Sequence, residues 1–202
     1  MSKTPAKPYQ PTAREQAALN ANNQRWQSKR SLPRLNVEVD ENGSVRTQLR
    51  HVDVEVASRL LEEALGTTSW DFLNGIVDQL CKFCKTDGQI SEDYLNFMLA
   101  TINGIEPRNE AEAMLALQMA VTHAATMQAS GYLIKTNEIP QYDNALKAMT
   151  KLARTYTTQM ETLKRFRSGG EQNVTVKHVH VHEGGQAIVG NVSSDRVGVG
   201  KK

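Results

Sequence analysis

Two cysteines three positions apart, Cys81 and Cys84, are the first residues in this sequence whose spacing could support chemistry. A Cys-x-x-Cys pair can supply half of a zinc site or a redox-active dithiol. A tetrahedral zinc site needs two further ligands, and the sequence has no second Cys-x-x-Cys and no closely spaced histidine pair nearby. A thioredoxin-like site requires a βαβ context, whereas the flanking pattern is helical. We therefore expect two reduced cysteines in the core of a helix.

The segment KTDGQISEDYL, residues 85–95, resembles the second half of a calcium-binding EF-hand loop. If Gly88 is position 6 of such a loop, positions 1, 3 and 12 are a phenylalanine, a lysine and a tyrosine, so the sequence excludes calcium there. His123 has no acidic partner at helical spacing and is expected in the core or at a helix contact. Glycine-rich phosphate loops are also missing from the sequence. We therefore predict no catalytic, metal or cofactor site and no enzymatic activity.

Three of the five histidines, His178, His180 and His182, alternate with valines in the segment VTVKHVHVHEGGQAIVGNV, residues 174–192. Alternation with period 2 predicts a β-strand, and Gly184-Gly185 followed by a second apolar run predicts a hairpin. Alternate residues of one strand lie about 6.5 Å apart, which is too wide for a single compact metal site. No functional metal is expected at these histidines.

The opposite face of this predicted strand carries four valines, provided that a bulge absorbs a one-residue slip in the pattern. A lone hairpin is unstable unless its apolar face is covered. The tail is therefore expected to dock on the helical domain or on another subunit. The predicted partner-binding residues are Val174, Val176, Val179 and Val181.

Residues 1–34 carry seven basic side chains against Glu15 alone and few apolar ones. Such a segment buries too little apolar surface to offset the entropy of ordering it, so we predict a flexible basic arm, which either contacts phosphates or only improves solubility. Valines flanking Asn42-Gly43 predict a short hairpin at its end. The arm with this hairpin occupies residues 1–50. The predicted nucleic-acid contacts are Arg25, Lys29, Arg30 and Arg34.

Between residues 51 and 168 the apolar residues recur with helical period, interrupted by glycines and capping residues. The pattern predicts an all-α fold, a bundle of about five helices with a long C-terminal helix. Flexible termini flank it, and the β-hairpin tail lies within residues 169–202. No apolar run is long enough to span a membrane and the N-terminus lacks the pattern of a secretory signal, so we expect a cytoplasmic protein.

The last predicted helix, from Ile139 or Pro140 to about Arg167, has an apolar seam with alternating spacings of four and three. A heptad seam of this kind can pack against the other helices of the bundle or against a second copy of the chain. The spacing alone leaves both open. The seam consists of Tyr142, Leu146, Met149, Ala153, Tyr156, Met160 and Leu163.

Four segments resemble a widespread group of uncharacterised alphaproteobacterial proteins that is common in rhizobial genomes. They are GTTSWDF (66–72), GIEPRNEAEAMLALQMAVTHAATM (104–127), KLARTYTTQMETLKRFRSGGEQ (151–172) and the tail at 174–192. The resemblance covers roughly residues 60–192. Some members are associated with prophage or plasmid regions. It implies a bacterial source and carries over no catalytic residue.

The function expected from these features is non-enzymatic assembly, with self-association through the long helix and the valine-rich tail to form a homo-oligomer. The alternative is a nucleic-acid-binding protein of the mobile-element or phage type that uses the basic N-terminal arm. No small-molecule substrate, no cofactor and no membrane partner are expected.

Overall fold

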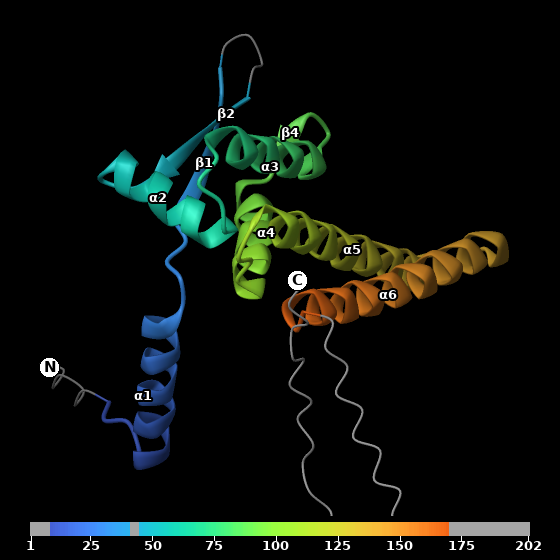
Figure 1. The fold of residues 1–202 in the computed structure, drawn as a ribbon. Helices are drawn as coiled ribbons and strands as arrows, with labels where there is room; N and C mark the ends of the chain where they lie inside the picture. Colours follow the sequence, from blue (N-terminus) through green and yellow to red (C-terminus); the bar gives the residue numbers. More distant parts are fainter. Residues whose placement is uncertain (1–8, 41–44, 170–202) are drawn as a thin grey trace, which may run out of the picture.

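The computed structural model of the protein describes residues 9–40 and 45–169 (Figure 1). The described chain is mostly helical, as the sequence predicts, and contains two small antiparallel sheets of two strands each. The predicted tail strand, with its valines and histidines, lies outside the described residues. The elements in chain order are α1 (Ala13–Ser28), β1 (Arg34–Val39), β2 (Val45–Arg50), α2 (Val54–Leu65), α3 (Trp70–Phe83), β3 (Lys85–Thr86), β4 (Gln89–Ile90), α4 (Glu92–Ile105), α5 (Glu110–Lys135) and α6 (Ile139–Arg167).

The hairpin of β1 and β2 is supported by α4. Two strands alone are marginal in water, so the sequence requires a neighbour for them. The backbone N–H of Leu35 donates to Oδ1 of Asn96 at 2.9 Å, and that of Val37 donates to Oε2 of Glu92 at 3.2 Å. The Leu35 side chain is 3% exposed. The hairpin is therefore part of the folded core, although the sequence assigned it to the N-terminal arm.

Local capping signals explain where the body helices begin and end. The side chains of Asp53, Ser69 and Ser91 accept backbone N–H groups at the starts of α2, α3 and α4. Gly66 ends α2 with φ of +63°, as expected for a left-handed C-terminal cap. Helix α4 continues through Asn103 and Gly104 to Ile105, and its left-handed cap is Glu106, φ +53°.

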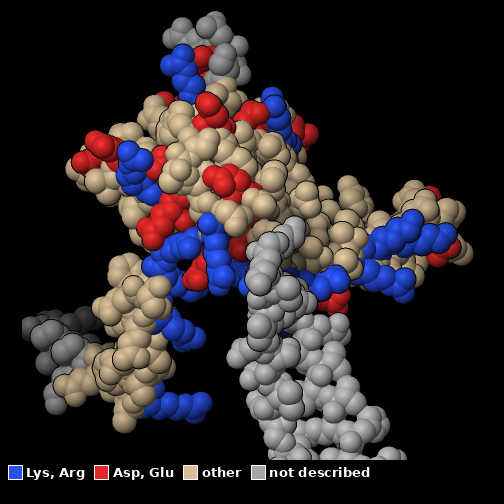
Figure 2. All heavy atoms as spheres, in the orientation of Figure 1, with Lys and Arg blue, Asp and Glu red and all other residues tan. Residues whose placement is uncertain are grey.

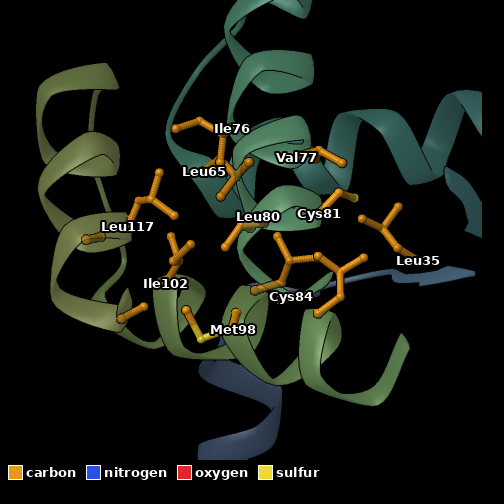
Figure 3. Close-up of a cluster of buried hydrophobic side chains, with 14 of the residues drawn as sticks. Leu35, Leu65, Ile76, Val77, Leu80, Cys81, Cys84, Met98, Ile102 and Leu117 are labelled. Carbon is orange, nitrogen blue, oxygen red and sulfur yellow. The ribbon is translucent and has the colours of Figure 1, made fainter. Parts of the chain in front are cut away.

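Helices α2, α3 and α4 surround a core of aliphatic residues with one side of α5 (Figure 3). The apolar stripes predicted for these helices are largely buried, and side chains from all four meet in the centre. Val54 is an exception, since it is 63% exposed at the start of α2. The central contacts are made by Leu65, Ile76, Leu80, Met98, Ile102 and Leu117.

The helices α5 and α6 form a two-helix arm that extends beyond the body (Figure 1). The buried residues of α5 lie almost entirely in its first 15 residues, whereas its C-terminal part extends away from the body beside α6 (Figure 1). Of the residues of α6, only Leu163 is buried. The predicted compact bundle is therefore a small helical body with a projecting helix pair.

The N-terminal segment is more ordered than the sequence predicts. Residues expected to be flexible contain the 16-residue helix α1, which begins with a capping box between Thr12 and Glu15. None of its residues is buried, and Trp26 is 78% exposed. The prediction of a flexible arm was based on composition. Composition does not include local capping or the high helix propensity of alanine, glutamine and arginine, which favour α1.

Candidate interaction surface

An ion pair with a buried carboxylate joins the two helices of the arm at their base, next to the body. Arg167, at the end of α6, donates from Nη2 and Nε to Oε2 of Glu112 at 2.8 and 3.1 Å. Its Nη2 also reaches the carbonyl oxygens of Ile105 and Glu106 at 2.9 and 3.0 Å. The Glu112 side chain is 3% exposed. The end of α6 is thereby fixed to the α4–α5 junction.

The ionisation of Glu112 follows from this environment. Burial is the largest single influence and would raise the pKa of Glu112. The hydrogen bonds from Arg167 and from the backbone N–H of Arg108, together with the charges of both arginines, outweigh burial and lower the pKa below its usual value. Glu112 is therefore charged in the folded protein at neutral pH.

The face of α6 that packs on α5 differs from the seam predicted by the heptad spacing. The residues of α6 with the lowest exposure are the buried Leu163 and the half-buried Ala145, Met149, Thr150, Leu152, Tyr156, Gln159 and Arg167. Three of these, Met149, Tyr156 and Leu163, belong to the predicted seam. Ala145, Leu152 and Gln159 each lie one position before a seam residue. At about 100° per residue, the mean direction of Ala145, Met149, Leu152, Tyr156, Gln159 and Leu163 is rotated by roughly 50° from the centre of the seam.

Rotation of the contact leaves half of the seam uncovered. Tyr142, Leu146 and Met160 are 45%, 39% and 47% exposed, and Ala153 between them is exposed as well. These four residues lie within about 40° of one another around the helix. We call them the α6 stripe. It is a continuous apolar line along most of the arm that α5 does not cover.

A groove between the two helices lies near the tip of the arm, on the side of their contact that is turned away from the α6 stripe. It has a volume of about 500 Å³. Its walls combine small alanines with the polar side chains of Gln128, Thr136, Gln141 and Asn144. Tyr132 at its edge is 70% exposed. The residues on its walls include Ala125, Ala129, Ala145, Ala148 and Leu152.

Basic side chains occupy a different face of α6. Lys147, Lys151 and Arg154 are exposed and lie on one side of the helix, roughly opposite the α6 stripe. Figure 2 shows lysines and arginines gathered along the arm. The arm therefore presents an apolar line and a basic line to different directions.

The four predicted nucleic-acid contacts divide into two pairs. Arg30 donates from Nη1 to the carbonyl oxygens of Glu63 and Pro107 at 2.9 and 2.8 Å, and Arg34 forms an ion pair with Asp93 at 2.9 Å. Their guanidinium groups are engaged in contacts within the chain. Arg25 and Lys29, by contrast, are exposed on and just after α1.

The cysteines, the Asp87-Gly88 turn and His123 make contacts that stabilise the fold. Cys81 and Cys84 are buried free thiols. Burial raises the pKa of both, that of Cys84 to about 11, so neither is poised as a thiolate nucleophile at neutral pH. Asp87 and Gly88, with φ of +50° and +83°, form the turn between β3 and β4. His123 lies at the α5–α6 contact, its ring centroid 6.2 Å from that of Tyr156.

Within residues 9–40 and 45–169, no three histidine, cysteine or acidic side chains are grouped closely enough to hold a metal ion. No helix in the same ranges is long and apolar enough to cross a membrane. Comparison of the chain with protein-family models, with curated proteins and with solved structures finds no match.

Sequence reasoning missed the residues that hold the arm in place. The sequence places Arg167 only at the end of the last predicted helix and gives Glu112 no role. Their pairing joins positions 55 residues apart, and no local pattern reports such a contact. A glycine at position 66 predicts the end of a helix, but it does not predict that the Pro107 carbonyl packs closely against this glycine.

Proposed function

We propose that the protein is a non-enzymatic assembly protein that self-associates through the arm formed by α5 and α6. The α6 stripe carries this proposal, since Tyr142, Leu146 and Met160 keep 39–47% of their surface exposed in an otherwise regular heptad pattern. An exposed apolar line of this length favours a protein contact. The bacterial, cytoplasmic and mobile-element setting implied by the resemblance is part of the same proposal.

A second copy of the chain fits the stripe best when the two α6 helices are antiparallel. The seam residues are spaced symmetrically along the sequence on either side of position 151. When the second α6 runs in the opposite direction, Tyr142 therefore lies opposite Met160 of the second copy, and Leu146 lies opposite its Tyr156. A twofold contact needs such self-complementarity. The two α5 helices then flank the pair and complete a four-helix bundle.

Charge supports the same orientation. Asp143 near the start of α6 and Lys164 near its end flank the stripe on the side away from α5. In an antiparallel pair, the acidic end of one helix approaches the basic end of the other. A parallel pair would instead bring like charges together.

Replacing Leu146 and Met160 by glutamate tests the proposal. Two carboxylates in the stripe would lose their hydration at the interface, so we expect the variant to have the monomer mass of 22.4 kDa by light scattering, with helical circular dichroism retained. The matched control is Thr155→Glu with Thr162→Glu, which adds the same charges on the opposite, exposed side of α6. The control should keep the mass of the unaltered protein. An unchanged mass for the stripe variant would refute the assignment.

A second candidate function is binding to nucleic acid. The exposed Arg25 and Lys29 of the N-terminal segment and the basic line on α6 favour it. The affinity for duplex DNA falls as salt rises, and each phosphate contact makes the slope of log K against log salt more negative by about 0.9. We expect replacement of Arg25 and Lys29 by serine to weaken DNA binding and to make this slope less steep by roughly two. Equal slopes for both proteins, or no binding by the unaltered chain, would argue against this function.

A further inference from the structure

The two outer edges of the β1–β2 hairpin differ in what covers them. On β1, the N–H of Leu35 donates to the Asn96 amide oxygen at 2.9 Å, and the Asn96 amide nitrogen donates back to the Leu35 carbonyl at 2.8 Å. The N–H of Val37 donates to the Glu92 carboxylate. Side chains of α4 therefore satisfy the backbone of this edge.

The edge of β2 has no such cover. Leu35 and Val37 face Leu49 and Thr47 in the antiparallel register. In such a pair, when one residue turns its N–H and C=O groups outward, so does its partner. Leu49 and Thr47 thus present these groups at the outer edge of β2. Within the described residues the only bond there is from the N–H of His51 to the Leu49 carbonyl, at 3.1 Å.

An apolar pocket of about 300 Å³ lies next to this edge. Its walls come from β2, α2 and α3 and include Leu49, Val54, Trp70 and Leu73. Trp70 is 53% exposed and Val54 is 63% exposed. A half-exposed tryptophan beside unpaired backbone groups is a favourable place for an added strand, because the strand pairs the backbone while its side chains cover the ring.

We propose that residues 174–181 of the same chain add to the outer edge of β2 as a third strand and cover Trp70. The segment has the alternation that this position requires. Val179 and Val181 lie on one face of an extended strand, which would be the face that carries Leu49 and borders the pocket. The alternate histidines then face solvent. This docking rests on the hairpin and its pocket, and it does not depend on pairing of α6.

The length of chain after α6 bears on whether the contact can form within one molecule. Arg167 binds the carbonyl of Ile105, and Leu35 binds Asn96, so the two anchor points are nine residues apart on α4, about 14 Å. A third strand lies about 10 Å beyond β1. The ten residues from Gly169 to Val179 span up to about 35 Å, which leaves about 11 Å of chain for the Arg167 and Asn96 side chains that complete the path.

Tryptophan fluorescence of the full chain tests the docking. The chain has two tryptophans, and Trp26→Phe leaves Trp70 as the only emitter. In that background, Val179→Asp with Val181→Asp should shift the Trp70 emission to longer wavelength and increase its quenching by acrylamide. His178→Asp with His180→Asp places the same charges on the opposite strand face and is the matched control. It should leave emission and quenching unchanged.

Amide hydrogen exchange gives the second readout. We expect the Thr47 and Leu49 amides to be protected in the unaltered chain and in the histidine control, and to lose protection in the valine variant. Identical emission for the valine variant, rapid exchange of both amides in the unaltered chain, or protection that disappears on dilution would overturn the intrachain docking. Mass measured in parallel reports on the α6 contact, so failure of one proposal is distinguishable from failure of the other.

Discussion

Replacing Gly66 by alanine is expected to destabilise the protein by about 3 kcal/mol or more. The residue has φ of +63°, and a Cβ atom there would lie 2.3 Å from the carbonyl oxygen and 2.8 Å from the carbonyl carbon of Pro107. The left-handed conformation costs an L-residue about 1–2 kcal/mol, and overpacking adds about 1–3 kcal/mol. Pro107 cannot easily move aside, because Arg30 binds the same carbonyl oxygen at 2.8 Å.

Urea unfolding followed by circular dichroism measures this loss. Gly104→Ala is the matched control, since Gly104 lies inside α4 and a Cβ atom there would meet nothing within 4 Å. That variant should be more stable than the unaltered protein by about 0.5–1 kcal/mol, because alanine loses less backbone entropy in a helix. If Gly66→Ala unfolded at the same urea concentration as the unaltered protein, the close packing of α2 on the α4–α5 junction would be contradicted.

Replacing Arg167 by methionine should cost about 3 kcal/mol of the free energy of unfolding, because it leaves the buried carboxylate of Glu112 without its cation. Arg165→Met, in the same turn but exposed, should change stability by no more than about 0.5 kcal/mol. Replacing Glu112 and Arg167 together by methionine should recover most of the loss, because no unpaired charge remains. If Arg167→Met were as stable as Arg165→Met, the ion pair between Arg167 and Glu112 would not contribute to the free energy of unfolding.

The pH dependence of the same variants has a defined sign. In the unaltered protein the pKa of Glu112 is lowered on folding, so its contribution is complete above the usual glutamate pKa and is lost as pH falls through the lower folded value. Without Arg167, burial dominates and should raise this pKa. Acidification from neutral pH toward the usual glutamate pKa should then stabilise Arg167→Met relative to the unaltered protein. A constant difference between the two across this range would contradict the assigned ionisation.

Features set by neighbours in the chain were predictable from the sequence. The serine caps, the glycine at the end of α2 and the helical period of the core depend on residues within one or two turns, and the structure contains them. The hairpin turn at Asp87-Gly88 also follows from local chemistry, although the same segment resembles half of a calcium loop.

Contacts between distant segments were not predictable in this way. The heptad spacing of α6 identified its apolar residues but not which of them α5 would cover, because a helix pair selects its contact angle by the packing of both surfaces. Arg30 is a second residue whose contact with distant segments the sequence did not predict. Its charge suggested a phosphate contact, whereas the fold uses it to bind two carbonyl oxygens.

The mass of the unaltered chain in solution, measured by sedimentation equilibrium over a range of concentrations, tests self-association through α6 most directly. The antiparallel pairing predicts a monomer–dimer equilibrium that approaches twice the chain mass of 22.4 kDa as concentration rises. Moderate ionic strength should weaken it only slightly, because the stripe is apolar. A mass of 22.4 kDa at the highest concentration at which the protein stays in solution would contradict the account.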